Sequence, residues 1–306
     1  MSWSEHEVIV NLTEIFAEGN SDVLVGIGDD GAVVARPITS VVITTDMAVE
    51  GVHFKSEWSS PIQIGRKAAA ANLADVIAMG GSAKYLVVAL AATGKEDLEF
   101  ILDIARGIAE EARVLDTQVI GGDLSRANQL VISITAFGEC DTPTKRSGAQ
   151  VGDEIYLSNL TGWSAAGLEL LTKGISEGEL EEFAIAEHKA PSVDYENGQV
   201  LAKSANSLCD VSDSVMTQSK QIAESSGVAF EIDGDLISQH LDFKDLESLA
   251  SKLNISVWQL ILGGGEDHAF LATGKNLPFF KIGTVKPGSG ILLKKIPAIN
   301  SGWEHF

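Results

Sequence analysis

The sequence predicts an α/β (α+β) protein with two domains, on three observations. The chain has 306 residues, about twice the usual length of a domain, although a single large domain is the alternative. Strand-like and helix-like patterns alternate along its first half. The stretch DTPTKRSGAQVGD, at 141–153, is rich in turn-forming residues and precedes a new strand. We therefore expect domains at 1–145 and 146–306 that share one cleft.

Hydrophobic periodicity defines the elements of the first half. Residues 4–17 carry apolar positions at helical spacing. The segment from Pro61 to Gly81 has an alanine-rich body and a Gly-Gly stop, which predict a helix. The remaining predicted elements are strands at 40–47, 84–92 and 129–139 and an amphipathic helix at 95–115.

The second half again mixes the two kinds of element. Helices are predicted at 164–173, 194–207 and 214–227. Strands are predicted at 154–159, 228–232, 258–262, 268–273 and 280–285.

Composition and charge exclude several classes of partner. Hydrophobic residues make up 45% of the chain, which allows a sizeable core. The 43 acidic residues outnumber the 22 basic ones and give a net charge of -21, which would repel nucleic acid and anionic membranes. We expect neither as a partner.

The cysteines and the N-terminal segment indicate a cytoplasmic protein. Cys140 and Cys209 lie far apart, without a CxxC pair, so neither a disulfide framework nor a zinc site is expected. The segment MSWSEHEVIV lacks the basic and apolar regions of a signal peptide, and the longest apolar stretch, near Leu86–Ala92, is too short to span a membrane.

Six acidic segments lie beside glycine or where a strand meets a turn. They are GIGDDGAVV (26–34), TTDMAVEGVHF (44–54), NLADVIAMGG (72–81), GGDLS (121–125), DVSDSV (210–215) and LGGGEDHAF (262–270). Mg²⁺ takes one or two carboxylates per ion plus waters and substrate phosphates, so several dispersed aspartates suit several ions. Converging aspartates without metal would repel one another, so a clustered set implies bound cations.

Taken singly, most of these aspartates also have ordinary structural explanations. Turns, strand ends and helix caps are the alternatives for Asp29, Asp30, Asp46, Asp123, Asp210 and Asp213. Ser212 or Asp213 could cap the helix that begins near 214. Asp75 differs, because it lies among apolar residues of a helix pattern, where exposure to solvent is a poor explanation. Phosphate-loop, protein-kinase and serine-hydrolase motifs do not occur in the sequence.

In their order and spacing, the motifs resemble those of the thiamine-monophosphate kinase family. The series along the chain is GIGDDGAVV, TTDMAVEGVHF, NLADVIAMGG, IGGDLS, KRSGAQVGD, DVSDSV, GGGEDHAF and GWEHF. Each motif is weak alone, whereas the ordered set covers nearly the whole chain and is highly specific. The motif TTDMAVEGVHF, with its histidine, best separates this family from its relatives.

This resemblance implies a fold, a reaction and partners. The wider group, the aminoimidazole ribonucleotide synthetase-like ATP enzymes, has an N-terminal sheet domain that dimerises and a C-terminal α/β domain, with ATP between them. Residues 1–145 would thus bind ATP and Mg²⁺ and form a homodimer, and 146–306 would complete the nucleotide and substrate site. The implied reaction transfers the γ-phosphoryl group of ATP to thiamine monophosphate, giving thiamine diphosphate and ADP.

The resemblance also implies roles for residues at matching positions. Those that would hold several Mg²⁺ ions are Asp30, Thr44, Thr45, Asp46, Asp75, Asp123, Asp210 and Asp213. Those that would contact ATP, the co-substrate, are Gly122, Asp123, Arg146 and Ser212. Those that would hold thiamine monophosphate are His53, Glu266 and Trp303. Those expected to be catalytic are Asp75, Asp123, Arg146 and Asp210.

Some of these positions have alternatives, and two positions depart from the family. His53 could be a structural histidine, Arg146 a linker charge and Trp303 an anchor for the chain end. An aromatic face can, however, stack on thiamine, and a guanidinium group matches a phosphate. Ser214 stands where the family usually has glycine, and His268-Ala269 replace the usual Tyr-Glu after GGED.

The implied acceptor favours direct transfer. A phosphate monoester has a second pKa of about 6, so it is largely dianionic at neutral pH and needs no general base. In-line attack builds negative charge that Mg²⁺ and Arg146 can offset, and no covalent phosphoenzyme is expected. The alternatives are a related ATP-dependent synthetase that forms an acyl or imidoyl phosphate, and a catalytically silent nucleotide-binding module.

Overall fold

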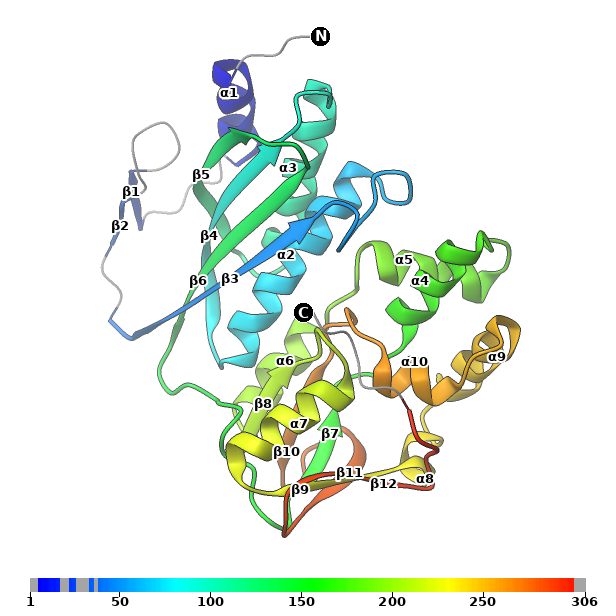
Figure 1. Cartoon of the computed structure of the whole chain (residues 1–306). Coiled ribbons are helices and arrows are strands. Elements are labelled where there is room, and N and C mark those ends of the chain that lie inside the picture. The colour runs from blue at the N-terminus through cyan, green and yellow to red at the C-terminus, as the bar shows by residue number, and fades with distance from the viewer. Residues whose placement is uncertain (1–4, 17–21, 26–32, 36–37, 300–306) are drawn as a thin grey trace. The chain divides into compact units, whose positions relative to one another are not determined.

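The computed structural model describes residues 5–16, 22–25, 33–35 and 38–299. Figure 1 shows the chain, which divides into two compact units. The N-terminal unit comprises Met1–Val76 and Gly81–Thr142, and the C-terminal unit comprises Ile77–Gly80 and Pro143–Phe306. None of the helices within the described ranges is both long and apolar enough to cross a membrane.

The N-terminal unit is built on a four-stranded sheet with the strand order β3-β6-β4-β5. Strand β6 pairs antiparallel with β3 and β4, whereas β4 pairs parallel with β5. Helix α1 packs on α3, which also contacts β5, and β1 and β2 form a separate small sheet. The elements are α1 (Glu5–Ile15), β1 (Val23–Val25), β2 (Val33–Val34), β3 (Ser40–Val49), α2 (Pro61–Ala78), β4 (Ser82–Ala92), α3 (Leu98–Arg113), β5 (Gln118–Arg126) and β6 (Val131–Cys140).

Small residues let α2 and α3 approach each other closely. A Cβ atom on Gly65 of α2 would lie 2.0 Å from the carbonyl oxygen of Ile104 in α3. A Cβ atom on Gly107 of α3 would lie 2.1 Å from the carbonyl oxygen of Ile62 in α2. Any side chain at either position would collide with backbone, so the two glycines set the distance between the helices. This contact holds α2, which carries Asp75, in place.

The C-terminal unit is built on a six-stranded sheet with the order β12-β9-β11-β7-β10-β8. All neighbouring strands are antiparallel except β12 and β9, which are parallel. A large apolar core joins this sheet to its helices. The elements are β7 (Glu154–Leu157), α4 (Trp163–Lys173), α5 (Glu179–Lys189), α6 (Tyr195–Ala202), β8 (Ser207–Asp210), α7 (Val215–Ser226), β9 (Ala229–Asp233), α8 (Gly234–Ile237), α9 (Phe243–Leu253), α10 (Val257–Gly263), β10 (Phe270–Gly274), β11 (Phe280–Lys286) and β12 (Gly290–Lys294).

Two expectations about elements are wrong, and one structural alternative is excluded. The apolar run at 258–262, expected as a strand, is part of helix α10, because a short buried apolar run suits either element. The helix expected at 194–207 ends at Ala202, and the buried strand β8 follows it. Asp123 does not end a strand, because β5 continues through it to Arg126.

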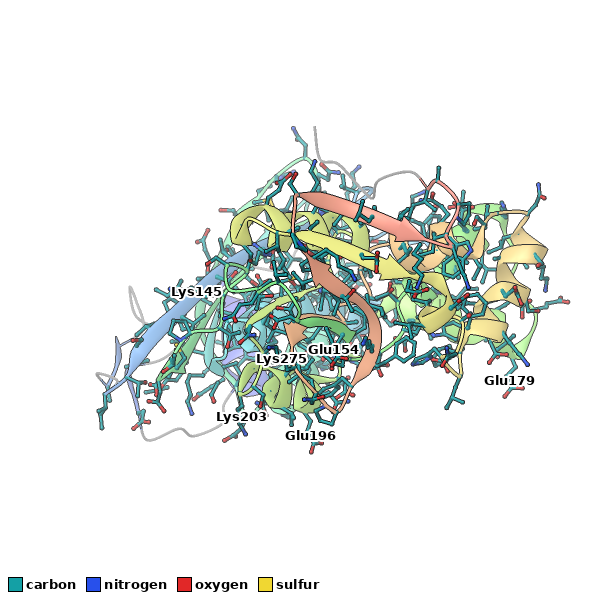
Figure 2. All side chains as sticks on the ribbon, turned by 90° about the horizontal axis from the view of Figure 1, so that it is seen from below. Lys145, Glu154, Glu179, Glu196, Lys203 and Lys275 are labelled. Carbon is teal, nitrogen blue, oxygen red and sulfur yellow. The ribbon has the colours of Figure 1, made fainter. Side chains whose placement is uncertain are left out.

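A polar cluster on β7 stabilises one side of the C-terminal sheet. Glu154 accepts hydrogen bonds from the ammonium group of Lys281, at 2.6 Å, from the hydroxyl of Tyr156, and from the backbone N–H of Asn276. Lys281 and then Tyr156 are the main causes that lower the pKa of Glu154 to about 2. Burial, followed by the Glu154 carboxylate, raises the pKa of Tyr156 to about 12. In Figure 2 Glu154 lies near Lys275, the neighbour of Asn276 in sequence.

We expect Glu154→Gln to lower the free energy of unfolding by about 1–2 kcal/mol at pH 7, because the carboxylate is partly exposed and its ion pair is partly screened. The folded-state pKa is lowered, so this stabilisation is present above the unfolded pKa near 4.5 and is lost as the pH falls towards 2. Urea unfolding of parent and variant at pH 7 and pH 3.5 measures the difference in their free energies of unfolding. The difference between variant and parent should shrink at pH 3.5, and an equal difference at both pH values would contradict this account.

Candidate functional site

Strand β3 and helix α2 bring together three of the residues predicted to bind metal. The hydroxyl of Thr44 donates to the carboxylate of Asp75 over 2.6 Å. The backbone N–H of Asp46 donates to the side-chain oxygen of Asn72 over 3.0 Å. Thr44 and Asp46 are two apart on a strand, so they share a face, and Asn72 and Asp75 are three apart on a helix. The arrangement is an oxygen-rich cluster in the N-terminal unit.

Thr45 lies on the opposite face of β3 from Thr44 and Asp46. Its hydroxyl donates to the carbonyl oxygen of Ile134 over 3.0 Å and accepts from the hydroxyl of Thr135 over 3.2 Å. The alternation of side chains along a strand therefore separates Thr45 from its two neighbours.

His53 is held by the turn that follows β3. Its Nδ1 accepts a hydrogen bond from the backbone N–H of Val49 over 3.1 Å. The turn needs Gly51, which has a φ of 80° and bonds to the carbonyl of Phe54. Because Nδ1 is the acceptor in a neutral ring, Nε2 carries the proton and can donate it. His53 is half-buried, so it combines a fixed orientation with access to solvent.

Gly122 and Asp123 lie on β5 beside an apolar pocket between helices and sheet. The pocket is lined by residues of α1, α3, β4 and β5, namely Leu12, Phe16, Val88, Leu90, Ile101, Ile104, Ala105, Ile108, Val119, Gly121, Gly122, Asp123 and Leu124. Asp123 is its only charged lining residue within the described part of the chain, and its carboxylate accepts from the Ser125 hydroxyl at 3.2 Å. A Cβ atom on Gly122 would lie 1.9 Å from the Val88 carbonyl oxygen, so strand packing by itself requires this glycine.

The segment 210–214 joins β8 to helix α7 in the C-terminal unit. Asp210 is buried at the end of β8, and Ser212 and Asp213 are half-buried. Ser214, not Ser212 or Asp213, caps α7, because its hydroxyl accepts from the backbone N–H of Thr217 over 3.0 Å. The cap therefore lies one residue after Asp213 and two after Ser212, the two candidates considered for it. The φ of 167° at Ser214 is extended backbone, which serine adopts without strain in place of glycine.

The loop after α10 lies directly against this segment. A Cβ atom on Gly265 would lie 2.4 Å from the carbonyl oxygen of Ser212, so only glycine permits the approach. The backbone N–H of Glu266 then donates to that same carbonyl over 2.6 Å. Glu266 and His268 both have positive φ, at 64° and 49°, a backbone state that is uncommon outside glycine and clusters at functional sites. The glycine-rich loop thus places Glu266 beside Ser212.

His268 contacts Asp210, a contact that the sequence did not predict. Its Nδ1 lies 3.1 Å from the Oδ2 atom of Asp210. The imidazole is 4% exposed and the aspartate 2%, so the pair is buried. Asn72, with its hydrogen bond to Asp46, was also missed, although its place three residues before Asp75 is a signal that it shares that helix face.

Asp267, next to Glu266, has a structural role instead. Its carboxylate accepts from the backbone N–H groups of Gly162 and Ser164 and so caps the start of α4, where Gly162 has no side chain. Burial is the main cause that raises its pKa to about 6, against the two hydrogen bonds. Of the two acids in the GGED motif, Asp267 is therefore explained by the start of α4, and Glu266 is the one that the family pattern assigns to a ligand.

The remaining predicted residues are exposed or outside the described ranges. The side chain of Arg146 is exposed, and its carbonyl oxygen accepts from the Ser226 hydroxyl. Among the residues that the structure describes, no acidic side chain forms an ion pair with Arg146, so the guanidinium is available for an anion. The predictions for Asp29, Asp30 and Trp303 lie outside the described residues.

The donor atoms of the described residues suit Mg²⁺, although these residues do not gather as a full set of ligands. In the described part of the chain, no three His, Cys, Asp or Glu side chains gather as a metal site. The contacts involve carboxylate and hydroxyl oxygens, as at Thr44 and Asp75. Mg²⁺ takes few protein carboxylates and keeps waters and substrate phosphates, so sparse oxygen donors fit an ion that arrives with a nucleotide.

Comparison with a family model identifies the N-terminal half. Residues 28–140 match the model described as AIR synthase related protein, N-terminal domain. This range contains β3, α2 and β5, which carry the N-terminal part of the candidate site.

Curated relatives and a solved structure extend the similarity to nearly the whole chain. A thiamine-monophosphate kinase of Mycobacterium tuberculosis is 37% identical over 255 residues, which cover 82% of this chain and 74% of that protein. One of Bacillus subtilis is 34% identical over 316 residues, covering 94% and 95%. A structure described as AaThiL complexed with AMPPCP and TMP has a TM-score of 0.82 at 28% identity and covers 100% of this chain and 99% of that one.

Proposed function

The chain belongs to the thiamine-monophosphate kinase family, and on this basis we propose that it phosphorylates thiamine monophosphate with ATP, by direct in-line transfer of the γ-phosphoryl group. The products are thiamine diphosphate and ADP. The observation that carries the proposal is the end-to-end likeness to the structure of AaThiL complexed with AMPPCP, an ATP analogue, and TMP. The two oxygen-rich segments around Asp75 and Asp210 support it.

We propose that the N-terminal domain, 1–145, binds the base of the nucleotide and supplies part of the metal site. The apolar pocket beside Gly122 and Asp123 suits an adenine ring, which is flat and largely apolar on its faces. Asp123 at its edge can accept hydrogen bonds, and it would also face Mg²⁺ bound to the phosphates.

We propose that the C-terminal domain, 146–306, completes the phosphate site. Arg146 supplies a guanidinium group that can bind phosphate oxygens bidentately. Ser212 accepts a hydrogen bond from Gln218 at its hydroxyl oxygen, over 3.1 Å, so its own proton is left to donate to ATP. Asp210 and Asp213 would bind metal beside them.

The proposed Mg²⁺ ligands are seven of the eight residues that the family pattern indicates. They are Asp30, Thr44, Asp46, Asp75, Asp123, Asp210 and Asp213. The side chain of Thr45 is left out, because it lies on the opposite face of β3 and its hydroxyl donates to Ile134. Bound Mg²⁺ neutralises negative charge on the phosphates during transfer. Because the acceptor phosphate is already dianionic, no side chain has to remove a proton, and Asp75, Asp123, Arg146 and Asp210 act by positioning and charge.

We propose that His53, Glu266 and Trp303 bind thiamine monophosphate. The fixed tautomer of His53 presents its Nε2 proton to an acceptor such as a phosphate oxygen. Glu266 carries the charge that a cationic thiazolium ring attracts, and an indole can stack on either ring of thiamine.

We further propose a cytoplasmic homodimer that forms through the N-terminal sheet. On β3, an edge strand, Val41, Ile43 and Met47 alternate with other residues and are 48%, 63% and 56% exposed. Apolar side chains in a row on one sheet face are typical of an interface between protein chains.

An assay with MgATP distinguishes the alternatives. ADP release that depends on thiamine monophosphate, with equal formation of thiamine diphosphate, is the expected result. ADP release that instead requires an aminoimidazole precursor would favour the related synthetase. ATP binding without turnover of either acceptor would favour a silent nucleotide-binding module.

Direct transfer predicts that the protein never carries the phosphoryl group. Rapid quench with γ-labelled ATP should leave the chain unlabelled at every time point, while labelled thiamine diphosphate accumulates. Replacing Cys140 and Cys209, both buried, by serine should leave kcat nearly unchanged. A labelled protein that forms and decays at the rate of turnover would overturn direct transfer.

A further inference from the structure

His268, which forms a buried pair with Asp210, is a residue to which neither the sequence motifs nor the proposed reaction assigns a role. The two residues are 58 apart in sequence and lie on segments that run side by side, with Phe270 opposite Asp210 in the register of β10 and β8. The backbone N–H of His268 donates to Val211, and that of Val211 donates to Ala269, so backbone bonds fix both ends of the contact.

The proposed role of Asp210 gives the hydrogen bond a direction. A metal ligand has to be a carboxylate, which only accepts hydrogen bonds, so beside a bound cation Nδ1 of His268 would donate to Oδ2 of Asp210. In the part of the chain that the structure describes, neither lysine nor arginine forms an ion pair with Asp210, so His268 is the basic side chain that meets this carboxylate.

A carboxylate with one oxygen held by a donor can present the other to a metal in a single orientation. Groups that orient metal ligands in this way tune metal affinity, and their loss commonly weakens it by about 10- to 100-fold. The positive φ of His268 shows that the loop adopts an unfavourable backbone state at the residue that makes this contact.

We propose that His268 is a positioning residue, which holds Oδ2 of Asp210 so that its other oxygen faces a divalent cation. The inference rests on the proposed function of Asp210 as a metal ligand. His268 itself would touch neither metal nor substrate, and its effect would pass through the orientation of Asp210.

The test compares His268→Phe, which keeps a ring without the donor, with His268→Asn, whose amide nitrogen can take the place of Nδ1. Mn²⁺ binding to the full chain is measured by electron paramagnetic resonance, and the Mg²⁺ concentration for half-maximal ADP release is measured at saturating ATP and thiamine monophosphate. We expect His268→Phe to raise the dissociation constant for Mn²⁺ and the half-maximal Mg²⁺ concentration by about 10- to 100-fold each. We expect His268→Asn to stay within about threefold of the parent, because it restores the donor.

A matched control is His188→Phe, which removes another buried imidazole of the same unit. His188 contacts the hydroxyl of Ser164 over 3.2 Å and is 8% exposed. The His188→Phe variant should have a lower midpoint of urea unfolding in EDTA, and its Mn²⁺ binding should be unchanged. If His268→Phe fails to fold, His268→Gln, whose amide reaches one bond further, takes its place with the same expected weakening.

The outcomes separate this inference from the proposed function. Unchanged metal dependence in His268→Phe, or equal weakening in His268→Asn, would show that the ring only fills space. If the parent shows no ADP release with thiamine monophosphate while Mn²⁺ binding still falls in His268→Phe alone, the reaction is wrong and the positioning role stands.

Discussion

Replacing Asp210 by asparagine is expected to lower kcat for thiamine diphosphate formation by at least about 100-fold and to raise the Mg²⁺ requirement. The change preserves the shape of the side chain but removes the negative charge of a buried carboxylate that contacts the imidazole of His268. Steady-state rates at increasing Mg²⁺ measure both effects. Asp75→Asn should behave alike, because Asp75 belongs to the cluster that includes Thr44 in the N-terminal unit.

A cap residue in the same unit provides the control for Asp210. Asp194 accepts a hydrogen bond from the backbone N–H of Asn197 at the start of α6. Asp194→Asn should cost less than about 1 kcal/mol of stability and leave kcat unchanged. Retention of more than half the activity in Asp210→Asn would remove Asp210 from the site.

Replacing Gly107 by alanine is expected to lower the free energy of unfolding by at least about 2 kcal/mol. Alanine is favoured over glycine within a helix by about 1 kcal/mol, so propensity alone predicts the opposite sign. The new methyl group would lie 2.1 Å from the carbonyl oxygen of Ile62, and relief of the collision requires a shift of a whole helix. Urea unfolding at pH 7 gives the difference.

Gly227→Ala separates this collision from the conformational cost of replacing a glycine. Gly227 ends α7 with a φ of 67°, and a Cβ atom there would meet nothing within 4 Å. Gly227→Ala should lower the free energy of unfolding by about 1 kcal/mol, which is less than the decrease expected for Gly107→Ala. A stabilised Gly107→Ala would show that α2 and α3 can separate freely.

Long periodic elements were predictable from the sequence. The strands expected at 40–47 and 84–92 lie within β3 and β4, the one expected at 129–139 overlaps β6, and α2 begins at the predicted Pro61. Short buried segments were not, because an apolar run such as 258–262 fits a helix or a strand until its surroundings decide. Strand β8 was hidden for the same reason.

The candidate site divides in a similar way. Asp75 could be singled out because a carboxylate among the apolar residues of a helix pattern stands out in a sequence. Asp46 was one of several aspartates at strand ends or turns, and Thr44 was indicated only by the family resemblance. The contact of His268 with Asp210 could not be predicted, since it depends on how strands β8 and β10 pair. The sequence could not decide among Ser212, Asp213 and Ser214 as the cap of α7, because serine and aspartate have similar capping preferences.

The alternation of side chains along β3 has a consequence for how this protein can diverge. Thr44 and Asp46 lie on the face that meets α2, whereas Ile43 and Met47 lie on the exposed face. A substitution on one face leaves the other unchanged. The exposed face can therefore change its protein partners during evolution while the residues of the candidate site stay the same. A single inserted residue would exchange the two faces, so β3 should accept varied residues over evolutionary time but not varied length.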